Sequence, residues 1–130
     1  MRFATRRTLL AGCLALGVAA SINVEVHAQV KPMPELCYVV VHKPGPSWKA
    51  GVPAFDQPGL QAHVEHFRRL LQEGKLLMGG PFMDGASGGM MVPEIGVSEA
   101  EITKFASEDP AVKSGLLVFE VRPWLAALRK

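Results

Sequence analysis

The sequence has few cysteines, few aromatic residues and no excess of charge in its larger part. Of its 130 residues, two are cysteines, 7% are aromatic and 20% are charged. Beyond the first 28 residues the chain holds 11 basic and 11 acidic side chains. This equal number of basic and acidic side chains argues against a nucleic-acid or anionic-membrane partner. The length and the 48% share of apolar residues predict one globular domain.

Motifs of several common active sites are missing. Ser87 has no G-x-S-x-G surroundings, which argues against a Ser-His-Asp hydrolase. The Gly-rich segment at 79–81 has neither a Lys-Ser/Thr nor a G-x-G-x-x-G context, so it is not predicted to bind phosphate. His42, His63 and His66 lack a Cys or carboxylate at a standard ligand spacing. We therefore predict no metal and no cofactor.

The first 28 residues have the order of an export signal. Paired arginines precede an apolar run that ends near Ile22, and small residues follow up to Ala28. The run of about 15 residues would measure about 22 Å as a helix, which is short for a bilayer core of about 30 Å. We expect a signal peptide at 1–28, a lead-in at 29–35, and a periplasmic or secreted bacterial protein without a stable membrane span.

The details of export leave two alternatives. Arg6 and Arg7 resemble a twin-arginine signal, although ordinary secretory signals also contain paired arginines. The segment that ends at Cys13 resembles a lipoprotein box, but it follows Arg7 too closely for the 7–15 apolar residues that normally precede cleavage. We favour the twin-arginine route without lipidation. Removal of the leader would leave Cys37 as the single thiol, which excludes an internal disulfide.

Beyond residue 35, apolar patterns predict strands and helices in alternation. The predicted strands are 36–43, 75–83, 89–95 and 116–121, and the predicted helices are 60–74, 99–107 and a short turn at 109–115. Ser98 and Glu101 form a capping box at the start of the second helix. The proline-rich segment 44–58 predicts a long loop or lid, in which Trp48 and Phe55 need cover. We expect Pro123 to end the last strand and a helical turn to follow.

The element order βαββαβ predicts an α+β, ferredoxin-like fold. Two right-handed βαβ units give a four-stranded antiparallel sheet with both helices on one face. The other face would expose valine, methionine and phenylalanine side chains over a larger area than soluble monomers usually tolerate. We therefore predict a homodimer.

His63 is the main candidate for chemistry. On the helix that begins at Leu60, it lies at the border of the apolar stripe, and His66 lies further out. A histidine titrates near neutrality and can move a proton on a bound molecule when a carboxylate holds its ring. We pair it with Asp109. The alternative is that His63 is a packed histidine at the core edge and that Asp109 only caps the turn at Pro110.

A series of short motifs resembles the YCII-related (YciI-like) family. The motifs are Tyr38-Val39-Val40, His63 in a helix that ends Glu73-Gly74-Lys75, Gly79-Gly80-Pro81, and Asp109-Pro110 followed by Gly115. The resemblance covers roughly 36–124, and we assign 36–130 to this domain. It implies a ferredoxin-like fold that dimerises into an α+β barrel, with His63 and Asp109 as a catalytic pair in a cleft. We assign substrate contacts to Tyr38, Gly79, Gly80 and Pro81.

Two hypotheses for the function follow. A related enzyme of the family removes chloride from a chlorinated hydroxyquinol, and muconolactone isomerases share the barrel. The first hypothesis is a cofactor-free proton-transfer enzyme, an isomerase or lyase, that acts on a small organic molecule such as an aromatic one. The alternative is a non-catalytic small-ligand-binding or structural dimer, in which His63 and Asp109 only join helix to loop.

Overall fold

The computed structural model describes residues 35–130. The elements are β1 (Leu36–Pro44), the short 3-10 helix η1 (Ala54–Asp56), α1 (Leu60–Gln72), β2 (Leu76–Pro81), β3 (Gly89–Pro93), α2 (Glu99–Ser107), α3 (Pro110–Lys113) and β4 (Leu117–Leu125). Within this range no helix is long and apolar enough to cross a membrane. The predicted signal peptide and all but the last residue of the lead-in lie outside the described residues.

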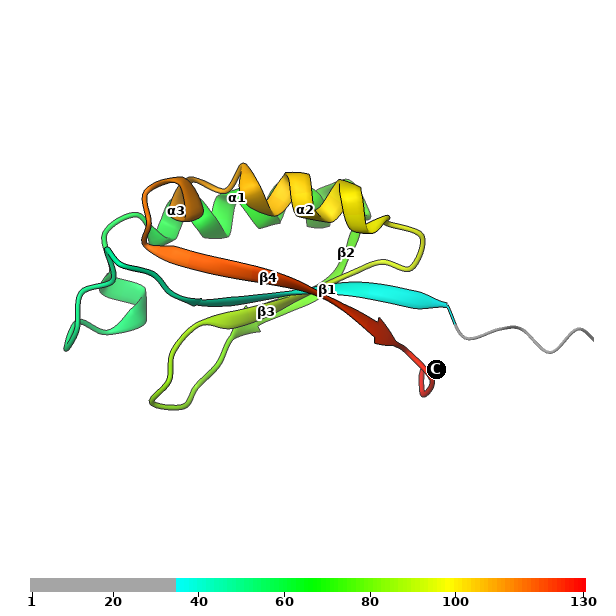
Figure 1. The fold of residues 1–130 in the computed structure, drawn as a ribbon, viewed down its shortest axis with the longest axis horizontal. Helices are drawn as coiled ribbons and strands as arrows, with labels where there is room; N and C mark the ends of the chain where they lie inside the picture. The colour runs from blue at the N-terminus through cyan, green and yellow to red at the C-terminus, as the bar shows by residue number, and fades with distance from the viewer. Residues whose placement is uncertain (1–34) are drawn as a thin grey trace, which may run out of the picture. The chain divides into compact units, whose positions relative to one another are not determined.

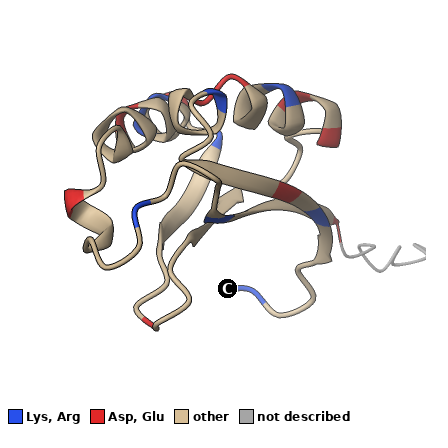
Figure 2. Cartoon of the chain, turned by 60° about the vertical axis from the view of Figure 1, so that its left-hand side comes forward, with Lys and Arg blue, Asp and Glu red and all other residues tan. Residues whose placement is uncertain are grey.

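The four strands form one antiparallel sheet in the order β2-β3-β1-β4. The helices lie together on one face of this sheet (Figure 1). The α+β, ferredoxin-like fold predicted from the element order is therefore confirmed. Figure 2 shows acidic and basic residues interspersed over the helices and β4, as expected from the even balance of charge.

The main core lies between the sheet and the two longer helices. Val40 at the centre of β1 is fully buried against Phe67 and Leu70 of α1 and Ile102 of α2. Each fully buried side chain of this size stabilises the fold by about 1.5–3 kcal/mol. The core therefore fixes α1 above β1, and this placement sets the position of the site described below.

The ends of the helices follow local signals. α1 stops before Gly74, whose φ of 69° suits a residue without a Cβ. At the start of α2 the side chain of Ser98 accepts a hydrogen bond from the backbone N–H of Glu101 at 3.2 Å. The Glu101 carboxylate accepts a hydrogen bond from Lys75 Nζ at 2.8 Å. Among the described hydrogen bonds, only the Ser98 half of the predicted capping box is therefore present.

β4 is longer than the sequence pattern predicts. Pro123 does not end the strand, because β4 continues to Leu125 with Pro123 opposite Tyr38 of β1. No helical turn follows in residues 126–130. The physical reason is that β4 lies at the edge of the sheet, where a missing N–H is tolerated. Pro81 lies in β2 at the opposite edge of the sheet.

A buried glutamine organises the proline-rich loop between β1 and α1. The side chain of Gln57 accepts a hydrogen bond from the N–H of Lys49 at 3.0 Å and donates to the carbonyls of Lys49 and Val52 at 2.7 and 2.9 Å. Trp48 is half-buried against the cluster formed by α3 and β4. Phe55 is 71% exposed, so the described part of the chain does not supply the cover expected for its ring. The loop is held by Gln57 instead of by that ring.

Candidate functional site

His63 of α1 and Asp109 at the N-cap of α3 are in direct contact. Nδ1 of His63 lies 2.6 Å from Oδ2 of Asp109, and both side chains are buried. Since an ionised carboxylate only accepts hydrogen bonds, Nδ1–H of His63 is the donor. The contact orients the ring and leaves its Nε2 available for another molecule.

The second oxygen of Asp109 has a structural task. Oδ1 accepts a hydrogen bond from the N–H of Ala111 at 2.9 Å, and Pro110 occupies the first position of α3. This is the cap that the Asp-Pro pair predicts. Asp109 therefore caps a helix and holds a histidine at the same time, so the two alternatives weighed from the sequence coexist.

The charge of Asp109 is set by opposing effects. Burial alone would raise the pKa of its carboxyl group, but the hydrogen bond and charge of His63 and the N–H of Ala111 outweigh burial and hold the pKa below its ordinary value. The carboxylate is therefore ionised at neutral pH and able to stabilise a proton on the His63 ring.

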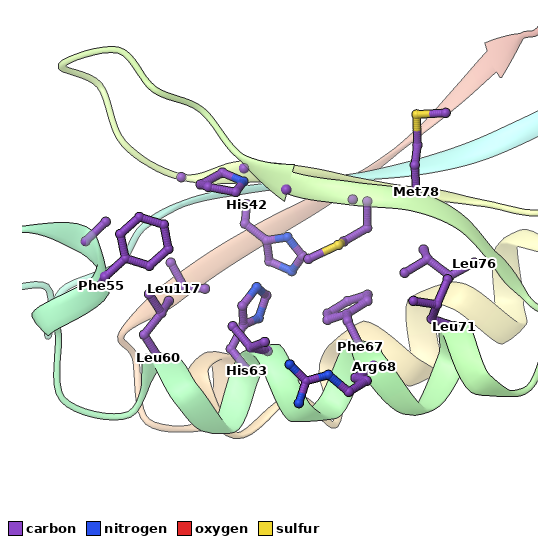
Figure 3. Close-up of a pocket in the computed structure, with 18 of the residues that line it drawn as sticks. His42, Phe55, Leu60, His63, Phe67, Arg68, Leu71, Leu76, Met78 and Leu117 are labelled. Atoms are coloured by element: carbon purple, nitrogen blue, oxygen red, sulfur yellow. The ribbon is translucent and has the colours of Figure 1, made fainter.

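A second histidine, His42 of β1, lies beside the pair. Its ring is edge-on to His63 at a centroid distance of 4.8 Å and to Phe67 at 5.3 Å (Figure 3). Its Nε2 lies 4.0 Å from Oδ2 of Asp109, beyond hydrogen-bond range. From the sequence alone, His42 is a candidate only as a metal ligand. The sequence feature that could have identified His42 is the alternation of side chains along β1, which places His42 on the same face as Val40.

His42 resists protonation. Its pKa is lowered to about 4, mainly by burial and further by the neighbouring His63, while the negative charge of Asp109 acts in the opposite direction. The charge of His66 on α1 also lowers it. At neutral pH the His42 ring is therefore an uncharged imidazole with one donor and one acceptor nitrogen.

Both His42 and His63 line a cavity of about 510 Å³, a size typical of small-molecule sites. Its walls come from the proline-rich loop, α1, β2 and β3 (Figure 3). Most of the other side chains are apolar, among them Leu60, Phe67, Leu71, Leu76, Met91 and Leu117. Of the predicted substrate contacts, Gly79, Gly80 and Pro81 line the cavity. Tyr38 packs against the main core instead, and the structure does not bring it to the cavity wall.

The chain matches a known protein family over most of the described residues. The YCII-related domain matches residues 37–125. The chain belongs to the YCII-related family. No curated protein matches it significantly.

One similar solved structure is 5-chloro-2-hydroxyhydroquinone dehydrochlorinase from Burkholderia phenoliruptrix AC1100, in complex with 2,5-dihydroxybenzoquinone. It is 20% identical to this chain, with a TM-score of 0.43, and the match covers 68% of this chain and 92% of that one.

Two glycines in this YCII-related domain lie where a Cβ would meet residues that line the cavity. A Cβ on Gly79 would lie 2.1 Å from the sulfur of Met91. A Cβ on Gly88 would lie 2.2 Å from the carbonyl oxygen of His42, and the φ of Gly88 is 91°. The Gly-rich turn before β3 can therefore pass directly over the backbone that carries His42.

Helical periodicity predicts that His66 lies further from the apolar stripe than His63. The structure contradicts this prediction. His66 is buried, its Nε2–H donates to the carbonyl oxygen of Phe105 at 2.8 Å, and its ring stacks on that of Phe105 at 4.1 Å. The physical reason is that α2 packs beside α1 and covers a wider stripe of it than the sheet alone would. His66 does not line the cavity, so its role is structural.

His42, His63 and Asp109 also form a group with potential metal-ligating atoms within 4.8 Å of one another. The contact between His63 Nδ1 and Asp109 Oδ2 measures 2.6 Å. Two atoms bound at about 2.0–2.1 Å to one tetrahedral zinc ion would lie roughly 3.3 Å apart. The geometry of these donors therefore fits a hydrogen-bonded pair better than a shared metal ion.

Replacement of His42 by phenylalanine should flatten the pH dependence of stability between about pH 6.5 and pH 4. The unfolded chain takes up this proton near the ordinary pKa of 6.5, and the folded chain only near 4. In this window the unfolded state binds more protons, so the unfolding free energy of the wild-type protein falls as the pH falls. The loss is roughly 3 kcal/mol. Urea unfolding at several pH values, followed by circular dichroism, measures it.

Met91→Leu is the matched control, because it alters the same cavity wall without removing a titratable group. This variant should keep the slope of the wild-type protein. A His42→Phe protein that also keeps the slope would show that the folded structure does not hinder protonation of His42.

Proposed function

We propose that this protein is a proton-transfer enzyme, an isomerase or lyase that needs no cofactor and acts on a small organic molecule such as an aromatic one. The proposal is carried by the 2.6 Å contact between His63 and the buried Asp109 at the wall of an apolar cavity. A carboxylate at Nδ1 fixes the tautomer in which Nε2 is the free base, and it stabilises the imidazolium that forms when Nε2 takes a proton.

The proton transfer starts at a carbon next to a carbonyl group. Nε2 of His63 accepts the proton, the electron pair of the C–H bond forms a C=C bond, and the carbonyl π pair moves to oxygen. In an isomerase, the substrate carries a second C=C bond next to this carbon: the carbonyl re-forms, the enolate pair forms a C=C bond to the neighbouring carbon, and the pair of the original second C=C bond takes the proton from His63 at its far carbon. In a lyase, the carbonyl re-forms, the enolate pair forms a new C=C bond to the adjacent carbon, and the leaving group on that carbon departs with its bonding pair and receives the proton from His63.

The cavity wall supports such chemistry. Its apolar side chains exclude water, which strengthens the interaction of the developing charge with the imidazolium and Asp109. Gly79 and Gly80 form a wall without side chains at β2, where a flat molecule can approach the backbone closely. In this proposal they and Pro81 shape the substrate site.

The alternative function is a non-catalytic small-ligand-binding dimer. The hydrogen bond from the Ala111 N–H to Asp109 favours it, because it gives the carboxylate a structural role that needs no reaction. In this case the His63–Asp109 contact only joins α1 to α3, and the cavity stores or carries its ligand.

Replacement of His63 by alanine separates the two functions. In a turnover screen of small metabolites and chlorinated phenols, a substrate of the wild-type protein should be converted about 10²–10⁴-fold more slowly by His63→Ala, because a positioned general base contributes this factor. Conversion is followed by NMR in deuterated water, which also records exchange of the abstracted proton.

His66→Gln is the control for this experiment, since His66 lies on the same helix outside the cavity. It should keep the turnover per folded molecule. Activity that survives His63→Ala would remove His63 from catalysis. Ligand binding without any turnover would favour the alternative function.

We also propose that the protein is a homodimer formed through the sheet face opposite the helices. Met78, Met90, Val118 and Trp124, each 37–59% exposed, alternate along the strands with residues that face the helices. Glu120 and Arg122 lie on the same face of β4 and supply both signs of charge, which a two-fold related copy can match. A second copy of the chain is therefore the proposed occupant.

A double substitution, Met90→Lys with Trp124→Lys, should make the protein monomeric, because it places charges in the apolar face. Size-exclusion chromatography with light scattering measures the mass. Leu128→Lys is the control, as Leu128 is almost fully exposed near the C-terminus, and it should leave the dimer intact. A wild-type protein that is monomeric at micromolar concentration contradicts the proposal.

Export to the periplasm or the medium is part of the proposal and rests on the order of charged, apolar and small residues in positions 1–28. In a bacterial host, we expect the chain in the periplasmic fraction with its N-terminus near Gln29, as read by mass spectrometry. Arg6→Lys with Arg7→Lys should retain it in the cytoplasm if the twin-arginine route operates.

Arg2→Lys is the control and should not affect export. Export that survives the double substitution would indicate the general secretory route, and a lipid mass on Cys13 would indicate lipoprotein processing. Cytoplasmic wild-type protein with an intact leader would contradict export altogether.

A further inference from the structure

The His42 imidazole is the buried polar group that the proposed mechanism leaves unused. The side chain is 1% exposed, and neither ring nitrogen has a hydrogen-bond partner among residues 35–130. Buried polar side chains almost always have a partner in folded proteins. The partner of His42 is therefore expected to be something other than a group of this domain.

The packing around His42 leaves the cavity as the source of that partner. The carboxylate of Asp109 already accepts hydrogen bonds from His63 and Ala111, and it lies 4.0 Å from Nε2 of His42. The rings of His63 and Phe67 hold the His42 ring edge-on. Figure 3 shows the ring between β1 and α1, next to His63, where both rings line the cavity.

The cavity wall defines the chemistry of the partner. Arg68 is the only Lys, Arg, Asp or Glu among the lining residues of the described domain, and its Nη1 donates to the Glu65 carboxylate at 2.5 Å. The one cationic side chain in the lining is therefore already paired with a carboxylate, and the rest of the wall is uncharged or apolar, which favours an uncharged ligand. A neutral imidazole offers one donor and one acceptor, which suits a hydroxyl or carbonyl oxygen.

We propose that His42 recognises the ligand through a hydrogen bond to an uncharged hydroxyl or carbonyl oxygen of a small, otherwise apolar molecule held in the cavity next to His63. The inference rests on the proposed function in one respect, that a small molecule enters this cavity, and it needs no reaction at His63. Where a reaction also occurs, the same hydrogen bond holds the oxygen that receives the electron pair.

A set of three probes of similar size tests this assignment. Phenol carries the hydroxyl group, toluene replaces it with a methyl group, and benzoate carries a charge. Affinities are measured by NMR titration of the purified protein. The ratio of phenol to toluene affinity should fall about 5- to 10-fold in His42→Phe, which corresponds to the net contribution of one hydrogen bond. Benzoate should bind the wild-type protein more weakly than phenol.

Two further variants and one spectroscopic signal make the test specific. His42→Gln keeps a donor and an acceptor and should restore part of the ratio, and His66→Gln, which lies outside the cavity, should leave the ratio unchanged. In long-range ¹H–¹⁵N spectra of the wild-type protein, phenol should shift a ring nitrogen of His42, and toluene should not. This signal does not depend on the folding of any variant.

The outcomes separate the inference from the proposed function. An unchanged ratio in His42→Phe, no binding of any probe by the wild-type protein, or stoichiometric Zn²⁺ uptake that His42→Phe loses would each overturn the inference. A ratio that depends on His42 without any turnover supports the inference while the proposed enzyme fails. Turnover lost in His63→Ala with a ratio independent of His42 supports the enzyme alone.

Discussion

The site depends on one buried carboxylate. Asp109 brings a negative charge into the interior, and such a group is costly unless each of its oxygens has a partner. The helix end supplies one partner through the N–H of Ala111, and α1 supplies the other through His63. Because both bonds are needed, the start of α3 and the first turns of α1 have to meet at a fixed distance. The cavity lies next to this contact between α1 and α3.

The sheet separates the two surfaces to which we assign function. The cavity lies on the side of the helices, where Leu76, Met91 and Leu117 reach it from three strands. Met78 borders the cavity at the rim, but its side chain is 59% exposed and points away from His63 in Figure 3. A chemical site and an assembly surface can therefore use the same strands, because successive residues of a strand face opposite sides.

Local signals explain which parts of the structure were predictable. The N-cap of α2 at Ser98 and the end of α1 before Gly74 depend on neighbours in sequence, and both lie close to where the pattern places them. The prediction that Pro123 ends the last strand was wrong because the effect of a proline depends on whether its strand is central or at the edge. Only the order of the strands in the sheet decides this. The predicted position of His66 was wrong for a similar reason, since the packing of α2 against α1 is a tertiary property.

The site was predictable only in part. His63 and Asp109 were chosen from residue type and family resemblance, and their 46-residue separation gave no evidence of contact. His42 was not singled out, because an isolated histidine in an apolar strand looks like any other buried position. Its significance comes from three facts that need coordinates: the distance to Asp109, the edge-on rings of His63 and Phe67, and the absence of partners for its nitrogens within the described domain.

Two histidines in one cavity differ because of their surroundings. His63 has a carboxylate at Nδ1, so a proton arriving at Nε2 produces a charge that Asp109 balances at 2.6 Å. His42 has the same side chain but no such partner, and burial beside His63 lowers its pKa and keeps its ring uncharged. If both protonated together, two positive charges would face each other across 4.8 Å in an apolar environment. The arrangement therefore favours a division of tasks, in which one imidazole exchanges protons while its neighbour stays neutral and remains able to hold an uncharged oxygen.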